Sequence, residues 1–297
     1  MAIIFAFPGS EAITDYVASD LNMARGKLEI RHFPDGETYV RLDSPVDGQN
    51  VIIVCSLDNP DHKILPLIFF AQVAREMGAK SIGLVAPYLG YMRQDKRFQD
   101  GEAVTADIFA AILSKTVDWL VTVDPHLHRH EKLGEIYRIP AKTIQASHHI
   151  ADWIKTNVTK PLLIGPDAES RQWVANAAQK AGAAFMILNK TRHGDRDVEV
   201  SLPDVEDYHD YTPVLIDDII STAHTMIETV THLKALKMKP PVCIGVHGIF
   251  ADGAFERLMA TGVQRIVTSN SILHKSNDIH IENILSSAIL NMIKKYK

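Results

Sequence analysis

VIIVCSLDNPDHKILPLIFFAQVAREMGAKSIGLVAP, residues 51 to 87, decides the fold class of the chain. Both ends of this stretch are apolar and rich in β-branched residues, without alternation, as expected of strands buried on both faces of a parallel sheet. Between them Leu65, Phe69, Val73 and Met77 recur every four residues, which predicts a helix with Gly78 as its cap. A strand, a helix and a strand in succession predict an α/β fold with right-handed crossovers.

A later stretch repeats this order. Residues 214 to 248, VLIDDIISTAHTMIETVTHLKALKMKPPVCIGVHG, again run from an apolar strand through an acid and a helical pattern to another apolar strand. The helical pattern spans residues 225 to 237 through Met226, Val230 and Leu233. The repeat predicts two similarly built domains, residues 1–145 and 146–297, each a mainly parallel sheet flanked by helices.

Composition and charge limit the classes of function. The chain has 297 residues, of which 46% are hydrophobic and 23% charged, and its net charge is -5. Because acidic and basic residues are interleaved, without a basic stripe, we expect no nucleic-acid partner. The first residues lack a charged leader and no apolar stretch reaches membrane-spanning length, which predicts a cytoplasmic protein with no membrane association. Cys55 and Cys243 lie in apolar runs and are expected to be buried, unpaired thiols.

The most informative polar cluster is PVLIDDIISTAHT, residues 213 to 225. Asp217 and Asp218 come at the expected carboxyl end of a strand, where open α/β sheets bind ligands. The hydroxyls of Ser221, Thr222 and Thr225 follow at the entry to a helix, whose free N–H groups and dipole favour a phosphate. Carboxylates suit sugar hydroxyls or Mg²⁺. A pentose 5-phosphate satisfies both halves. Alternatively, the Ser and Thr residues are ordinary helix caps, although the combined pattern favours the ligand.

Two polar stretches of the first half contain cations and acids. RHFPDGETYVRL, residues 31 to 42, has a Pro-Asp-Gly turn and by itself is typical of an exposed charged hairpin. APYLGYMRQDKRFQDGEAVTAD, residues 86 to 107, follows an apolar strand and contains Arg93 and Gln94. Cations in such a loop can bind polyphosphate, but many loops of this kind are only solvated.

Three further segments contain candidate ligands or catalytic groups. VDPHLHRH, residues 123 to 130, places His126, His128 and His130 after a strand, but no acid or thiol set completes a zinc cage. One histidine could give Mg²⁺ a ligand alongside nucleotide oxygens, and we expect the other two to be solvated or capping groups. GPDAES ends a strand with Asp167. LNKTRHGDRDVEVSL, residues 188 to 202, presents basic residues between strand-like runs, and alone it is typical of an ordinary basic hairpin.

Taken together, these motifs resemble the ribose-phosphate diphosphokinase (phosphoribosyl diphosphate synthase) family, which has a type I phosphoribosyltransferase-like fold. The motifs FPDGE, APYLGYMRQD, DPH, PDA, KTR and DDIIST occur in the order typical of the family and cover nearly the whole chain. The resemblance implies transfer of the diphosphoryl group of ATP to the anomeric hydroxyl of ribose 5-phosphate. It also implies Mg²⁺ as cofactor and a homo-oligomer in which the FPDGE segment of one subunit serves the ATP site of its neighbour.

The resemblance assigns roles to individual residues of this chain. Lys190 and Arg192 would be catalytic, because fixed cations can neutralise charge that develops during phosphoryl transfer. Metal ligands would be His126 and Asp167. ATP contacts would be Asp35, Gly36, Glu37, Arg93 and Gln94. The ribose-5-phosphate site would comprise Arg192, Asp217, Asp218, Ser221, Thr222, Ala223, His224 and Thr225.

The sequence departs from the family pattern at two places. His224 stands where the phosphate loop usually has Gly, and Glu169 and Ser170 replace a pair of small residues after Asp167. Two alternatives stay open, the first suggested by these changes and the second by the ribose-phosphate-binding segment, which the two families share. One is a non-catalytic regulatory homologue that acts by binding a partner subunit. The other is a phosphoribosyltransferase that consumes phosphoribosyl diphosphate, for which the ATP-type motifs would have no purpose.

Overall fold

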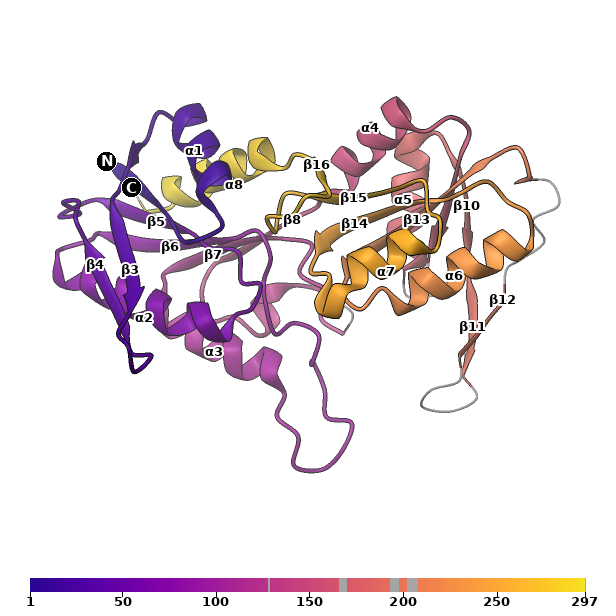
Figure 1. The fold of residues 1–297 in the computed structure, drawn as a ribbon. Coiled ribbons are helices and arrows are strands. Elements are labelled where there is room, and N and C mark those ends of the chain that lie inside the picture. The colour runs from indigo at the N-terminus through magenta and orange to yellow at the C-terminus, as the bar shows by residue number, and fades with distance from the viewer. Residues whose placement is uncertain (128, 166–169, 193–197, 202–207, 297) are drawn as a thin grey trace. The chain divides into compact units, whose positions relative to one another are not determined.

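The computed structural model of the chain describes residues 1–127, 129–165, 170–192, 198–201 and 208–296. The chain forms two compact units (Figure 1). Unit 1 comprises residues 1–144, 271–273 and 281–297, and unit 2 comprises residues 145–270 and 274–280. The C-terminal residues therefore pack with unit 1. The predicted functional domains, 1–145 and 146–297, stay a prediction.

Unit 1 is built on a six-stranded parallel sheet of order β2-β1-β5-β6-β7-β8. Its strands are β1 (Ala2–Ala6), β2 (Ala24–Arg25), β5 (Asn50–Val54), β6 (Ser81–Ala86), β7 (Trp119–Val123) and β8 (Ala141–Ile144). Every residue of the three central strands β5, β6 and β7 is buried. This confirms the reading of apolar runs as strands covered on both faces.

Helices cover both faces of this sheet. Helices α1 (Glu11–Asp20) and α8 (Glu282–Lys294) contact each other on one face, and α2 (Asp61–Glu76) and α3 (Thr105–Thr116) contact each other on the opposite face (Figure 1). The 3-10 turn η1 (Leu133–Glu135) precedes β8. Phe70 of α2 packs edge-on against Phe5 and Phe7, with ring centroids 5.0 and 5.8 Å apart.

The helix predicted from residues 51–87 is confirmed as α2, and Gly78 follows it with a φ of 84°. Its buried residues, however, are Pro66, Leu67, Phe70, Ala71 and Ala74. The stripe that revealed the helix includes Leu65 and Phe69, which are 52% and 41% exposed. The apolar period thus identified the helix but not the face that packs on the sheet.

Unit 2 repeats this architecture. Its parallel sheet has the order β10-β9-β13-β14-β15-β16, in which the strands occur in the same relative sequence as in unit 1. The strands are β9 (Pro161–Gly165), β10 (Ala184–Ile187), β13 (Thr212–Ile220), β14 (Val242–Gly248), β15 (Arg265–Ser269) and β16 (Asn277–Ile279). The helices are α4 (Ser147–Asn157), α5 (Arg171–Ala181), α6 (His224–Ala235) and α7 (Ala254–Ala260), with the 3-10 turn η3 (Ala251–Gly253) before α7. The predicted internal repeat is confirmed.

Each unit also has an antiparallel hairpin at the same place in the repeat. In unit 1, β3 (Leu28–His32) and β4 (Thr38–Leu42) follow the edge strand β2 and precede the central strand β5 along the chain. In unit 2, β11 (Asn189–Arg192) and β12 (Val198–Ser201) lie between β10 and β13. The FPDGE turn and the Lys-Thr-Arg segment therefore belong to equivalent hairpins, the first between the two strands and the second on the first strand of its hairpin.

Both cysteines are buried and unpaired, as predicted. Burial raises the pKa of the Cys55 thiol to about 12 and raises that of Cys243 as well. Both thiols are therefore protonated and unreactive in the folded protein. None of the helices in the described part of the chain combines the length and apolarity needed to span a bilayer.

Candidate active site

The acidic pair lies within strand β13. This strand pairs with β9 only as far as Leu215, but with β14 as far as Ile220, so it extends beyond β9 at the carboxyl edge. The sequence placed the strand end at Asp217 and Asp218, and the strand instead continues for two residues because Ile219 and Ile220 pair with β14. Both aspartates are partly buried. Asp217 Oδ1 accepts a hydrogen bond of 2.9 Å from the Asp218 N–H.

A short loop leads from β13 into α6. The N-cap residue of α6 is Ala223, which has φ 58° and ψ 14°, a left-handed conformation that costs a side-chain-bearing residue about 1–2 kcal/mol. Because Ala223 has no side-chain oxygen, α6 has no side-chain cap at its N-cap position. The start of the helix thus retains the character of an anion site.

Residue His224, which departs from the family pattern, points its side chain outward. This side chain is 79% exposed, and its Nε2 atom lies 3.4 Å from Glu228 Oε1, one turn along α6. The imidazole therefore lies along the outer surface of α6.

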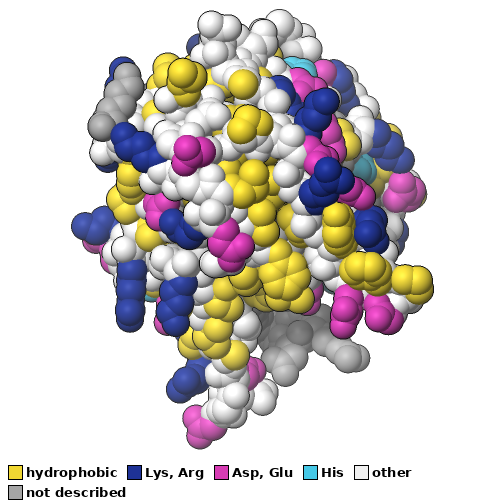
Figure 2. Space-filling view, turned by 90° about the vertical axis from the view of Figure 1, so that its left-hand side faces the viewer, with side chains coloured by type: hydrophobic (Ala, Val, Ile, Leu, Met, Phe, Trp, Pro, Cys, Tyr) yellow, Lys and Arg dark blue, Asp and Glu magenta, His cyan; other side chains and the backbone are white. Residues whose placement is uncertain are grey.

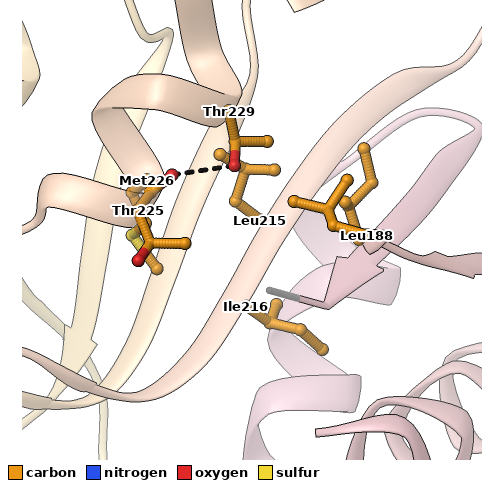
Figure 3. A pocket seen from close by; sticks show the side chains of 7 residues that line it. Leu188, Leu215, Ile216, Thr225, Met226 and Thr229 are labelled. Atoms are coloured by element: carbon orange, nitrogen blue, oxygen red, sulfur yellow. Dashed lines mark hydrogen bonds between the residues drawn. The ribbon is translucent and has the colours of Figure 1, made fainter. Parts of the chain in front are cut away.

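Behind the loop is a small apolar pocket between α6 and the sheet (Figure 3). It is lined by Ile164, Leu188, Leu215, Ile216, Thr225, Met226 and Thr229. The Thr229 hydroxyl donates to the Thr225 carbonyl at 2.8 Å and so faces its own helix (Figure 3). Such an apolar lining does not fit a sugar phosphate.

In unit 1 the equivalent loop joins β5 to α2, and its polar groups bind one another. After β5, the Lys63 ammonium donates to the Ser56 carbonyl at 2.8 Å and to Asp58 Oδ1 at 2.6 Å. Helix α2 then begins with an acid, Asp61, in its first turn. A negative charge at this helix start and an internal ion pair do not suit a phosphate. The hydroxyl-rich segment at a helix start, Ser221 to Thr225, therefore occurs in unit 2 and has no counterpart in this loop of unit 1.

The other predicted groups of unit 2 are only partly described. Strand β9 ends at Gly165, and Asp167 lies outside the described residues. Lys190 and Arg192 lie on strand β11, where the register pairs them with Val200 and Val198 of β12. The sequence assigned them to a polar loop, and the structure places them instead on a strand that pairs with β12.

The FPDGE segment forms the tip of the β3–β4 hairpin. Gly36 has a φ of 92°, which favours glycine, and its N–H donates to the Phe33 carbonyl at 2.9 Å. Asp35 Oδ1 accepts a 3.2 Å hydrogen bond from the Glu37 N–H. Asp35, Gly36 and Glu37 are all exposed. The Arg31 guanidinium stacks on the rings of Phe33 and Tyr39, with its carbon 4.8 and 4.0 Å from their centroids.

The loop that contains Arg93 and Gln94 joins β6 to α3. The Gln94 side-chain oxygen accepts a 3.1 Å hydrogen bond from the Thr105 hydroxyl. The backbone carbonyl of Gln94 accepts one of 3.2 Å from the Ala106 N–H. Gln94 is thereby fixed at the first turn of α3. Further along, the Glu102 carboxylate accepts hydrogen bonds from the N–H groups of Phe98 and Gln99 at 2.8 and 3.2 Å.

The histidine segment follows the neighbouring strand β7. His126 has a φ of 54°, and its N–H donates to the Asp124 carbonyl at 2.9 Å. His130 Nδ1 lies 3.1 Å from Glu135 Oε2, whereas His128 lies outside the described residues. In the residues that the structure describes, no three metal-ligating side chains come together.

Sequence reasoning did not find an ion pair between these two loops. Arg129 Nε lies 3.2 Å from Asp95 Oδ1, and the side chain of Asp95 is only 12% exposed. The pair ties the Arg93–Gln94 loop to the His126 segment. No sequence signal could have identified it, because the partners are 34 residues apart and both lie in polar loops.

The duplicated six-stranded sheet, the two equivalent hairpins and the loop at α6 define a tandem phosphoribosyltransferase-like protein. Residues 2–116 match the N-terminal domain of ribose phosphate pyrophosphokinase, and residues 132–276 match the phosphoribosyl transferase domain. The chain belongs to the ribose-phosphate pyrophosphokinase family, whose members are transferases.

Individual relatives support this assignment along the whole chain. The ribose-phosphate pyrophosphokinase of Methanobrevibacter smithii is 31% identical, with 97% of this chain and 99% of that protein covered. That of Saccharolobus solfataricus is also 31% identical, with 98% and 100% covered. A solved structure, phosphoribosylpyrophosphate synthetase from Mycobacterium smegmatis, matches with a TM-score of 0.86 at 23% identity, over 99% of this chain and 100% of that chain. The last match shows that the fold is shared.

Proposed function

We propose that the chain transfers the β,γ-diphosphoryl group of ATP to the anomeric hydroxyl of ribose 5-phosphate. The anomeric oxygen forms a bond to the β-phosphorus, the bond from that phosphorus to the α,β-bridging oxygen breaks, and AMP leaves. The hydroxyl proton is released, and the products are AMP and phosphoribosyl diphosphate. The observation that carries this proposal is the start of α6, which has no side-chain cap and follows two partly buried carboxylates on an extended strand.

In this proposal residues 221–225 hold the 5-phosphate of the sugar. Ser221, Thr222 and Thr225 supply hydroxyl donors, and Ala223 and His224 supply backbone N–H groups where the helix dipole favours an anion. Asp217 and Asp218 accept hydrogen bonds from the ribose hydroxyls. Arg192 adds a cation to this set, as the family resemblance implies.

ATP binds to unit 1 through Arg93 and Gln94. The hydrogen bonds that fix Gln94 at the start of α3 give it a defined position, which supports a role in binding rather than in solvation. Asp35, Gly36 and Glu37 serve ATP from the exposed tip of the β3–β4 hairpin. That exposure suits a segment that reaches the nucleotide of a neighbouring subunit.

Catalysis then rests on positioning and electrostatics. Lys190 and Arg192 close over the reacting β-phosphorus and stabilise the charge that develops on its oxygens. Mg²⁺, when bound, spreads the charge of the diphosphate. We assign His126 and Asp167 as its protein ligands. Of these two residues the structure describes only His126. A single imidazole fits a cation whose remaining ligands would be phosphate oxygens and water.

We also propose a homo-oligomer in the cytoplasm. The exposed apolar residues Leu65 and Phe69 of α2 and Ile108 and Ile112 of α3 come from two helices that contact each other. In Figure 2, apolar side chains adjoin one another over the lower part of this side of unit 1. Exposed apolar side chains grouped on neighbouring helices favour association between subunits. The two unpaired thiols fit a reducing compartment.

A coupled assay for AMP tests the proposal. Purified protein is incubated with Mg²⁺ and ATP, with and without ribose 5-phosphate, and the product is offered to an enzyme that depends on phosphoribosyl diphosphate. AMP that appears only with the sugar phosphate, together with a competent product, is the expected result. Absence of AMP, under conditions in which an active family member works, would favour the regulatory homologue. Loss of phosphoribosyl diphosphate that depends on a nucleobase would favour a phosphoribosyltransferase.

A further inference from the structure

The segment that follows β14 donates hydrogen bonds to successive backbone carbonyls, first at the end of β13 and then in residues 221–225, which we call the phosphate loop. The N–H groups of Ile249 and Phe250 both donate to the Ile220 carbonyl at 3.0 Å. The next N–H, that of Ala251, donates to the Ser221 carbonyl at 3.1 Å. Residues 249–251 thus hold the end of β13 and the first residue of the loop.

The third carbonyl, that of Thr222, is bound by a side chain from α7. Arg257 Nη2 donates to the Thr222 oxygen at 3.4 Å, and Arg257 Nη1 donates to the Asp252 carbonyl. A guanidinium can bridge two acceptors because its donors form a rigid, planar fork. Arg257 therefore connects the phosphate loop to the turn η3, which precedes its own helix.

The Thr222 carbonyl matters because of the geometry of the peptide that contains it. A trans peptide is planar, so its C=O and N–H groups point in opposite directions. When Arg257 holds the Thr222 carbonyl on its own side of the loop, the N–H of Ala223 faces the other side. That N–H belongs to the left-handed residue at the start of α6, next to the donors that we assign to the sugar phosphate.

We propose that Arg257 is a positioning residue for the ribose-5-phosphate site: it holds the Thr222–Ala223 peptide in the orientation that presents the Ala223 N–H to the 5-phosphate. This inference deepens the proposed function and rests on it. Arg257 acts through the backbone of the loop and does not touch the substrate. Such support matters at this peptide, because the left-handed conformation at Ala223 has to be stabilised by its surroundings.

Hydrogen exchange of the protein without substrate tests the contact itself. In Arg257→Gln, we expect amide exchange in peptides that cover residues 219–226 to be at least about fivefold faster, since the loop loses a local constraint. Arg265→Gln is the matched control, because Arg265 is an exposed arginine of the same unit that pairs with Asp278 at 2.9 Å. Unchanged exchange in the Arg257 variant would overturn the inference whether or not the protein makes AMP.

Kinetics then test the consequence for the substrate. Arg257→Gln is expected to raise the KM for ribose 5-phosphate about five- to twentyfold, while kcat and the KM for ATP change less than about twofold. Arg257→Lys keeps the charge but cannot bridge both carbonyls, and we expect it to retain most of the defect. A lysine variant with normal KM would show that charge alone is needed and would overturn the positioning role. If the unmodified protein forms no AMP, the proposed function fails separately from the exchange result.

Discussion

Asp95 and Arg129 join the loops that follow the neighbouring strands β6 and β7, with 3.2 Å between Asp95 Oδ1 and Arg129 Nε. Arg93 and Gln94 lie directly before this aspartate, and His126 lies three residues before the arginine. The ion pair therefore couples the proposed nucleotide contacts to the proposed metal ligand.

Loss of this pair should weaken ATP binding. Because Arg129 is 48% exposed, solvent screens the interaction, and we expect Asp95→Asn to raise the KM for ATP about two- to fivefold. Arg25→Gln, which removes the Arg25–Asp15 pair on the same unit, should leave this KM unchanged. Initial rates at varied ATP and saturating ribose 5-phosphate measure the difference. An unaltered KM in Asp95→Asn would show that the loops hold their positions without the pair.

Stability should rise when the left-handed residue becomes glycine. We expect Ala223→Gly to increase the free energy of unfolding by about 0.5–1 kcal/mol, because glycine adopts a positive φ without the steric cost of Cβ. Ala175→Gly, within helix α5, should instead cost about 1 kcal/mol. Urea unfolding followed by circular dichroism measures both. A stability loss in Ala223→Gly would mean that the methyl group, which is buried, contributes more through packing than it costs in strain.

Removal of the His224 side chain should not harm sugar-phosphate binding. The imidazole is 79% exposed and faces Glu228, so His224→Gly is expected to keep or lower the KM for ribose 5-phosphate. Glu228→Gln breaks the same pair without altering the loop and serves as the control. A large rise in KM in the glycine variant alone would make His224 itself a ligand.

Lys190 should act on turnover rather than on binding. Lys190→Ala is expected to lower kcat by about 10²–10³, since a fixed donor at the developing charge is worth that much in comparable sites. The KM for ATP should change far less. Lys160→Ala removes an exposed lysine of the same unit and should have no effect on either parameter. A normal kcat would remove Lys190 from the mechanism.

Acid should destabilise the protein partly through His274. Burial, together with the charge of Lys275, lowers the pKa of His274 below its ordinary value, while Glu256 opposes this shift. The folded state therefore binds this proton less readily than the unfolded chain. The contribution of His274 to the free energy of unfolding is fully present above the ordinary histidine pKa of about 6.5, and it is lost as the pH falls through the lowered pKa.

The melting temperature between about pH 5 and pH 8 measures this effect. His274→Asn should melt with a weaker dependence on pH than the unmodified protein, whereas His232→Asn, at an exposed position of α6, should not change the slope. Identical slopes in all three proteins would show that His274 does not contribute to the loss of stability in acid.

The sequence was sufficient for features that depend on local patterns. Apolar runs identified β5 and β6 of one sheet and β13 and β14 of the other, because strands buried on both faces need no alternation. The hydroxyl-rich segment at residues 221–225 placed the helix start correctly, since its residue types suit few other positions. The equivalence of the two hairpins follows from the repeat, although it became visible only when both sheet orders were known.

Features that depend on distant contacts could not be predicted in the same way. The exposure of Leu65 and Phe69 depends on which side of α2 meets the sheet, and an apolar period alone does not distinguish a core face from an outer apolar face. Arg257 lies 35 residues from Thr222, and its guanidinium acts on a backbone oxygen, which leaves no pattern of paired residue types. The extension of β13 past its acids depends on its pairing with β14.

The packing of α8 has a consequence for the order in which the protein folds as it is synthesised. This helix contacts α1, β7 and β8 in unit 1, and the Tyr296 hydroxyl donates to the Asp118 carbonyl at 2.8 Å. Residues 282–294 leave the ribosome after all other helices and strands of both units have emerged. Unit 1, although its other elements are made first, therefore keeps one face of its sheet partly uncovered until residues 282–294 have emerged, and exposed apolar surface of this kind favours aggregation.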